Sequence, residues 1–225
     1  EERALCAATF MSMQMVRHFP QRQAEFERFL SFEEASPQER EAWKQAFDAF
    51  ARKLTLRYGP ERRLLFKEPA HTARIKLILE LYPNARFVHI HRHPFDVYRS
   101  TMAMERVTRP LYAYQPTDDD KLEDFVLWRY RAMYDAYFRA ADHVPAGQLF
   151  EIGFDRLERE PKQALAEAYE ALGLAGFDTV EPRLEAYLAS LGSYAKNAHA
   201  ELPRETAARV RQAWQPSFER WGYAP

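Results

Sequence analysis

The sequence predicts an α/β fold, rich in helices, whose centre is a short parallel β-sheet. Three short apolar runs have the length and composition of buried strands, at residues 63–66, 86–91 and 148–152. Helical segments separate these runs, and a strand–helix–strand unit with parallel strands is almost always right-handed. Because polar side chains collect directly after the first two runs, we expect a ligand site at the carboxyl edge of the sheet.

The composition is that of a globular protein. The 225 residues suit one domain, which we expect to contain a helical segment (1–60), a parallel α/β core (61–175) and a C-terminal helical segment (176–225). A formal net charge of −1 argues against nucleic acid as a partner, and no apolar run reaches the roughly 20 residues of a membrane span. The single cysteine, Cys6, excludes an internal disulfide and favours a cytoplasmic protein.

The first 60 residues are expected to be helical. The sequence begins at Glu1 without a methionine, so we expect that truncation or processing removed residues before it. Residues 1–30 mix apolar residues with Arg and Gln in a helical pattern. Ser36-Pro37-Gln38-Glu39 fits a capping box, and the helix that it opens should run to about Arg57 before Gly59 ends it.

The later segments alternate between loops and helices. Residues 102–117 contain two prolines and are predicted to form a loop over the ligand edge. The acidic run 118–120 fits a helix cap better than a calcium site. The following helix, 121–142, is aromatic, and we expect its rings in the core rather than in a pocket for a small molecule. Further helices are predicted at 161–172, 182–191 and 203–214.

Arg92 and Ser100 form the first candidate site. Arg92 follows the second strand, Pro94 opens a helix, and Ser100 lies on an early turn of that helix. Free backbone N–H groups and the helix dipole attract an anion there, and a guanidinium group matches phosphate. The alternative is a structural arginine that pairs with Asp96, and the residues alone leave both readings open.

Lys67, Glu68 and His71 form a second candidate group after the first strand. A lysine at a strand end can stabilise a developing oxyanion, and a neighbouring Glu or His can accept a proton. The alternative is that Glu68 merely neutralises Lys67 while His71 starts a helix. His89, His91 and His93 alternate along the next strand, and we favour packing over a metal site for them.

A glycine-rich phosphate loop is missing from the sequence. Such a loop needs glycines so that the backbone can approach the anion. The first glycine is Gly59, and none of the seven glycines lies in a P-loop pattern.

With these residues in place, the stretch LLFKEPAH…LYPNARFVHIHRHPFDVYRST resembles the centre of sulfotransferases that use 3′-phosphoadenosine 5′-phosphosulfate, especially the broad bacterial group. Residues 150–174 resemble the family's strand–acidic turn–helix block, and residues 194–223 resemble its C-terminal loop, helix and Trp-Gly-Tyr ending. The resemblance implies a P-loop NTPase-like three-layer fold, here without its first strand and 5′-phosphosulfate loop. The usual tyrosine of the second block is Phe154 in this chain.

The resemblance also implies roles for individual residues. His71 or Glu68 would be the catalytic base, with His71 preferred because an ordinary imidazole titrates near neutrality, and Lys67 would stabilise the leaving oxygen. Arg92 and Ser100 would hold the 3′-phosphate of the nucleotide. Two further donor-binding candidates lie in the C-terminal loop, Lys196 and Asn197.

The reaction implied is transfer of a sulfuryl group from that nucleotide to a hydroxyl or amine of a small-molecule, lipid or carbohydrate acceptor, with no metal. Two alternatives remain open: a silent binding module on the same scaffold, and a nucleotide kinase-like enzyme. The kinase would need a Walker loop and an acidic magnesium ligand, and the sequence contains neither. The oligomeric state is not readable from the sequence.

Overall fold

The computed structural model describes residues 1–192 and 200–224. The chain divides into two compact units. The first, which we call the helical unit, comprises Glu1–Pro83 and Met102–Asp142; the second, the sheet unit, comprises Asn84–Thr101 and His143–Pro225. Helix α6 (Pro94–Tyr112) contributes its beginning to the sheet unit and its end to the helical unit. The predicted single-domain organisation stays a prediction.

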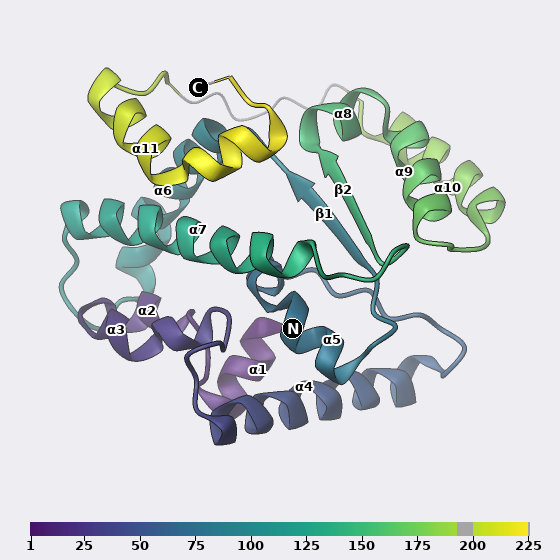
Figure 1. Cartoon of the computed structure of the whole chain (residues 1–225), viewed down its shortest axis with the longest axis horizontal. Coiled ribbons are helices and arrows are strands. Elements are labelled where there is room, and N and C mark those ends of the chain that lie inside the picture. The colour runs from purple at the N-terminus through teal and green to yellow at the C-terminus, as the bar shows by residue number, and fades with distance from the viewer. Residues whose placement is uncertain (193–199, 225) are drawn as a thin grey trace. The chain divides into compact units, whose positions relative to one another are not determined.

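The sheet unit is built around two parallel strands, β1 (Phe87–His91) and β2 (Leu149–Gly153). They pair in register from Phe87 opposite Leu149 to His91 opposite Gly153, and they lie side by side in Figure 1. Both runs are rich in β-branched and aromatic residues, which suit a pleated, partly buried surface. Two of the three predicted strands and the parallel character of the sheet are therefore confirmed. The strands that pair are the second and third predicted runs, not the first and second.

Helices complete the sheet unit. Helix α9 begins at a proline, as the sequence predicts, and packs beside β2, with α10 packed against it in turn (Figure 1). Helix α11 bends at the buried Trp214, two residues before Pro216, whose ring cannot continue a regular helix. The helices of the unit beyond α6 are α8 (Phe154–Arg159), α9 (Pro161–Ala171), α10 (Phe177–Ser190) and α11 (Arg204–Trp221).

The helical unit contains the helix that the capping box predicts, α4 (Pro37–Tyr58). Its capping box is present: Glu39 N donates to Ser36 Oγ at 3.2 Å, and Ser36 N donates to Glu39 Oε2 at 2.9 Å. The buried rings of Trp43 and Phe47 stack with centroids 5.1 Å apart and anchor an apolar core. Helix α4 therefore begins and ends as the sequence predicts.

The rest of the helical unit is a set of shorter elements. Residues 1–30 are mostly helical, as predicted, but they are broken into several short pieces. Helix α7 is capped by Asp118, whose side chain accepts from Asp120 N at 2.9 Å. The elements are α1 (Glu2–Thr9), α2 (Met15–His18), η1 (Pro20–Arg22), α3 (Gln23–Phe26), η2 (Glu27–Phe29), η3 (Pro69–Arg74), α5 (Ile75–Leu81) and α7 (Asp119–Ala141).

The strand predicted at residues 63–66 is wrong. Among the described residues the sheet has two strands, and no other segment pairs with this run. Its last residue, Phe66, packs instead against Phe47 and Phe50 of α4, with ring centroids 5.2 and 6.3 Å apart. A short apolar run can be held by a helix as well as by a strand, so its composition alone does not decide its structure.

The loop predicted at residues 102–117 is also wrong, because α6 continues to Tyr112. Met102, Glu105 and Arg109 are buried on one face of this helix, at the three- and four-residue spacing of α-helical turns. Pro110 lies near the end of α6, where little helix remains to be disrupted. Packing of that face therefore outweighs the local cost of the proline.

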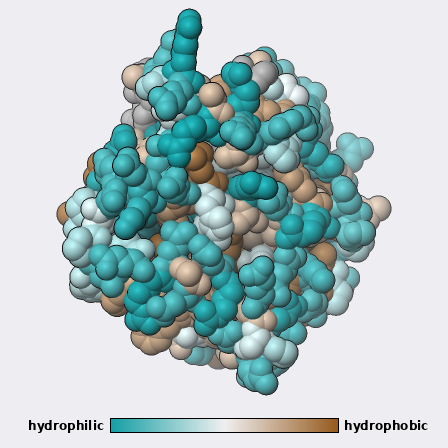
Figure 2. Space-filling view, turned by 60° about the vertical axis from the view of Figure 1, so that its left-hand side comes forward, coloured by the Kyte–Doolittle hydropathy of each residue, from teal (hydrophilic) through white to brown (hydrophobic). Residues whose placement is uncertain are grey.

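The surface and helix α7 help to decide whether the aromatic side chains of α7 lie in the core or line a pocket. In the space-filling view of Figure 2, hydrophilic side chains predominate and hydrophobic ones emerge in small groups between them. The aromatic side chains of α7 at Phe125, Tyr130, Tyr134 and Tyr137 are buried, which favours the core reading. Within residues 1–192 and 200–224, no helix combines the length and the apolar character needed to cross a bilayer.

Candidate functional site

Lys67, Glu68 and His71 lie at the start of η3 in the helical unit. Glu68 Oε1 accepts a hydrogen bond from Ala70 N at 3.3 Å and so caps this short helix. Lys67, just before it, is exposed, whereas the side chain of His71 is only 12% exposed. The local sequence KEPAH thus places an exposed cation next to two partly buried proton-accepting groups.

His71 lies in an aromatic and electrostatically uneven pocket. Its ring stands edge-on to Trp43 and Phe47, with centroids 6.5 and 5.6 Å away. Both ring nitrogens are buried without a hydrogen-bond partner among the described residues, and Nε2 is 3.9 Å from Glu1 Oε1. Burial, helped by the positive charge of Arg74, lowers the pKa of His71 to about 3. The imidazole is therefore neutral at pH 7.

The pKa of Glu68 is shifted in the opposite direction. Burial raises the pKa of its carboxyl group above the ordinary value of 4.5, and the charges of Glu2 and Glu1 add to the rise. A base works best when its pKa lies near the operating pH, so the two shifts favour Glu68 over His71 as a proton acceptor. The reason for preferring His71, its ordinary pKa, does not hold in this environment.

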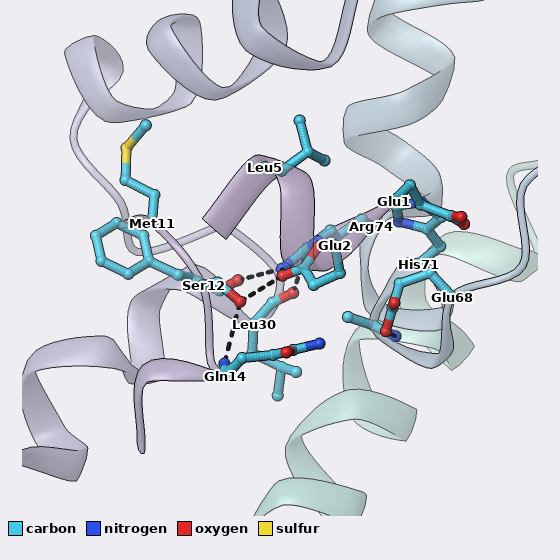
Figure 3. Close-up of polar contacts among 12 residues, drawn as sticks. Glu1, Glu2, Leu5, Met11, Ser12, Gln14, Leu30, Glu68, His71 and Arg74 are labelled. Atoms are coloured by element: carbon cyan, nitrogen blue, oxygen red, sulfur yellow. Dashed lines mark hydrogen bonds and ion pairs between the residues drawn. The ribbon is translucent and has the colours of Figure 1, made fainter. Parts of the chain in front are cut away.

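A buried ion pair between Arg74 and Glu2 holds η3 in place. Arg74 donates to Glu2 Oε2 at 2.6 Å and to Glu2 Oε1 at 2.9 Å, and Ser12 Oγ donates to Glu2 Oε1 at 2.6 Å (Figure 3). Arg74 also donates to the carbonyl oxygens of Leu30 and Phe29. Although burial acts to raise it, these bonds and the charge of Arg74 lower the pKa of Glu2. The pair thus anchors the turn that carries Glu68 and His71.

No local pattern in the sequence predicts this pair. Arg74 follows His71 by three residues, but its partner Glu2 lies 72 positions earlier in the chain. Residues so far apart meet only through the packing of α1 and η3 in the folded unit. Sequence reasoning therefore missed both members.

Arg92 lies at the carboxyl end of β1 in the sheet unit. Its guanidinium carbon is 4.8 Å from the centre of the Phe154 ring, and Nε is 3.7 Å from Asp96 Oδ2. The predicted pairing with Asp96 thus exists as an ion pair, but Arg92 Nε is buried without a hydrogen-bond partner. Phe154, which replaces the expected tyrosine, supplies the face on which Arg92 rests. This orphaned N–H group is the kind that an incoming anion satisfies.

The beginning of α6 follows Arg92 directly, and the side chains of its first turns are held by hydrogen bonds. His93 Nδ1 accepts from Phe95 N at 3.2 Å, so its Nε2 carries the proton and donates to the carbonyl of Ala224 at 3.1 Å. Asp96 accepts from Arg99, while Ser100 is exposed two turns into the helix. A groove of about 360 Å³ begins here, lined in part by His93, Phe95 and Arg99.

The C-terminal Trp-Gly-Tyr segment packs against the end of β1. Trp221 stacks on His91 with centroids 4.7 Å apart and an angle of 3°, and Tyr223 Oη is hydrogen-bonded to His91 Nδ1 at 2.7 Å. Gly153 leaves room for the ring of His91, because a Cβ atom at position 153 would lie 3.3 Å from His91 Cε1. Gly222 has φ +64°, which lets the chain turn back from α11 to Tyr223. The ring of His89, 5.5 Å from Trp221, packs there too, as the packing interpretation of the alternating histidines expects.

The predicted site residues fall into three sets. Lys67, Glu68 and His71 belong to the helical unit, and Arg92 and Ser100 belong to the sheet unit. That the two sets share one rim stays a prediction. The predicted donor-binding residues Lys196 and Asn197 lie outside the described residues.

A strand-end arginine followed directly by the beginning of a helix fits the class of protein that the sequence resembles. Residues 3–179 match the sulfotransferase family, and the chain belongs to that family. The solved structure of sulfotransferase STF9 from Mycobacterium avium is similar, with a TM-score of 0.71 over 87% of this chain and 49% of that one. At 19% identity, this likeness shows a shared fold.

Relatives of known activity are similar over the whole length of this chain. Omega-hydroxy-beta-dihydromenaquinone-9 sulfotransferase Stf3 from Mycobacterium bovis is 30% identical over 223 residues, and so is its counterpart from Mycobacterium tuberculosis. The match covers 99% of this chain and 57% of each relative, so the chain spans little more than half of their length.

Proposed function

We propose that this chain carries the 3′-phosphate-binding and acceptor-activating residues of a sulfotransferase that uses 3′-phosphoadenosine 5′-phosphosulfate. The observation that carries the proposal is Arg92, with an unsatisfied Nε at the end of β1, followed by the beginning of α6, in a chain of the sulfotransferase family. Arg92 would bind the 3′-phosphate with one guanidinium edge, and Ser100 would add a neutral donor. The P-loop-like arrangement of the whole fold belongs to the same proposal.

In the proposed reaction the acceptor hydroxyl forms a new bond to sulfur while the bond between sulfur and the bridging oxygen of the nucleotide breaks. The acceptor proton passes to Glu68, whose raised pKa makes it the stronger base, and the neutral His71 beside it orients the hydroxyl. Lys67 stabilises the negative charge on the departing bisphosphate. Positioning and charge stabilisation supply most of the rate, as in phosphoryl transfer.

The acceptor that we propose is an apolar molecule with a terminal hydroxyl group. The support is the activity named for the Stf3 relatives, which act on an omega-hydroxy dihydromenaquinone. A cytoplasmic location stays a prediction from the single cysteine.

Donor binding tests the central claim. Arg92→Ala should weaken binding of 3′-phosphoadenosine 5′-phosphate, measured by calorimetry, by roughly 30- to 100-fold, the equivalent of about 2–3 kcal/mol for a charged hydrogen-bonded contact. Arg86→Ala is the matched control, because Arg86 precedes the same strand and donates to the carbonyl of Gly173. Equal affinities of Arg92→Ala and wild type would remove Arg92 from the site.

Transfer of a radiolabelled sulfuryl group separates the two candidate bases and the alternative function. Glu68→Gln should lower kcat by about 10²–10⁴-fold, whereas His71→Asn should lower it less. The reverse order would make His71 the base. If the wild-type protein binds the nucleotide but transfers nothing to any hydroxylated lipid or phenol, the silent binding module is the better description.

A further inference from the structure

A buried carboxylate in the helical unit is surrounded by three guanidinium groups. Glu105 of α6 has no exposed side-chain surface, and its Oε1 lies 3.1 Å from both Arg17 Nη2 and Arg129 Nη1. Arg109, one turn further along α6, has Nε 3.9 Å from Glu105 Oε2. Helices α2, α6 and α7 each contribute to this cluster, which we call the arginine cluster (Arg17, Glu105, Arg109 and Arg129).

Arg109 is the least satisfied member of the arginine cluster. Its side chain is only 5% exposed, yet neither Nε nor Nη2 has a hydrogen-bond partner among the described residues. These two nitrogens form one edge of the guanidinium group, the edge that binds an oxyanion through two parallel bonds. Its carbon lies 5.1 Å from the centre of the Phe125 ring, and that of Arg129 lies equally close. The ring cannot supply the missing acceptors.

The arginine cluster carries more positive than negative charge. Three arginines face one carboxylate, and within residues 1–192 and 200–224 no other acid is in ion-pair contact with any of the three. Burial lowers the pKa of Arg109 and of Arg129 despite the opposing charge of Glu105. Excess buried charge of this kind is costly unless a counter-charge meets it.

We propose that the arginine cluster is a binding site for a small tetrahedral dianion such as sulfate or phosphate, either as a free ion or as the anionic group of a small molecule. A dianion balances the excess of two positive charges and presents several oxygens to the edge of Arg109 that makes no hydrogen bond. Arg17 and Arg129, whose side chains are 24% and 26% exposed, lie nearer to solvent than Arg109, whose side chain is 5% exposed. This inference does not depend on the proposed transfer reaction.

Thermal unfolding with inorganic sulfate and phosphate tests the proposal, with sodium chloride at equal ionic strength as the reference. Sulfate also stabilises proteins without binding them, so the site must show itself as a saturable shift. The wild-type protein should gain about 5–10 °C in Tm near saturation. Acetate, a monoanion, should produce a smaller shift. Acetate as effective as sulfate would overturn the assignment of a dianion.

Two matched variants complete the test. Arg109→Gln should remove most of the saturable shift, whereas Arg139→Gln, the same change at an exposed arginine of α7 that pairs with Glu33, should retain it. If Arg109→Gln does not fold, Arg17→Gln should weaken the apparent affinity for sulfate about tenfold, the effect of one charged hydrogen bond. Equal saturable shifts in wild type and either cluster variant, or no saturable shift in the wild type, would overturn the proposal.

Discussion

The two groups of site residues differ in how the chain builds them. In the sheet unit, Arg92 lies between its near neighbour Asp96 and Phe154, which follows the paired strand β2, and its side chain is 37% exposed. In the helical unit, His71 is 12% exposed and depends on the buried Glu2–Arg74 pair, whose members lie 72 positions apart. The position of the strand-end arginine can thus be predicted from a short motif, whereas the pKa values of His71 and Glu68 depend on the packing of distant residues.

The largest effect should come from breaking the buried pair. Arg74→Met leaves the carboxylate of Glu2 buried without its partner, so the free energy of unfolding should fall by about 3–5 kcal/mol in urea denaturation. Arg139→Met, at an exposed pair with Glu33, should cost less than about 1 kcal/mol. Similar losses in both variants would contradict the importance given to burial in the helical unit.

The next effect tests the sheet unit. Trp221→Ala removes the ring stacked on His91 and the hydrogen bond from Trp221 Nε1 to Glu151 Oε1. We expect a loss of about 3 kcal/mol from this truncation, measured by chemical denaturation. Trp221→Phe keeps a stacked ring and should recover part of it. A loss below about 1 kcal/mol would mean that the C-terminal segment does not hold the end of β1.

The pH dependence of stability should separate the two units further. The pKa of His71 is lowered from 6.5 to about 3, so the unfolded chain binds one more proton than the folded chain between these values. Its contribution is complete above pH 6.5 and is lost as the pH falls toward 3, with a slope of up to about 1.4 kcal/mol per pH unit.

The variant His71→Phe isolates this contribution. It keeps an aromatic ring beside Trp43 and Phe47 and cannot titrate, so its unfolding free energy should fall less steeply between pH 6.5 and 4. The same comparison with His89→Phe reports on the sheet unit, where burial lowers the pKa of His89 to about 4. Identical pH profiles for wild type and His71→Phe would show that His71 is not buried as a neutral group.

The smallest effect concerns a purely local feature. Ser36→Ala removes the capping bond from Glu39 N and should lower the free energy of unfolding by about 1 kcal/mol. Ser36→Asp should restore most of the loss, because a carboxylate accepts the same bond at a helix N-terminus. A cost above about 2 kcal/mol for Ser36→Ala would mean that even α4 depends on wider packing around its first turn.

Prediction succeeded where structure depends on near neighbours. The capping box of α4, the acidic cap at Asp118 and both paired strands are local patterns, and each is present. It failed at residues 63–66 and 102–117, where the partner that decides the structure is distant: Phe66 packs on α4, and Glu105 meets Arg17 and Arg129. Prolines and apolar runs report local preference, and tertiary contacts worth several kcal/mol override it.

The sequence by itself determined the family, the two parallel strands and the position of Arg92 after the first of them, because these follow from short motifs and local periodicity. Only the tertiary structure decided that burial lowers the pKa of His71 and raises that of Glu68, and that one edge of Arg109 makes no hydrogen bond. The reason is physical: a pKa and a charge balance depend on which distant groups exclude water around a side chain, and no short stretch of sequence encodes that.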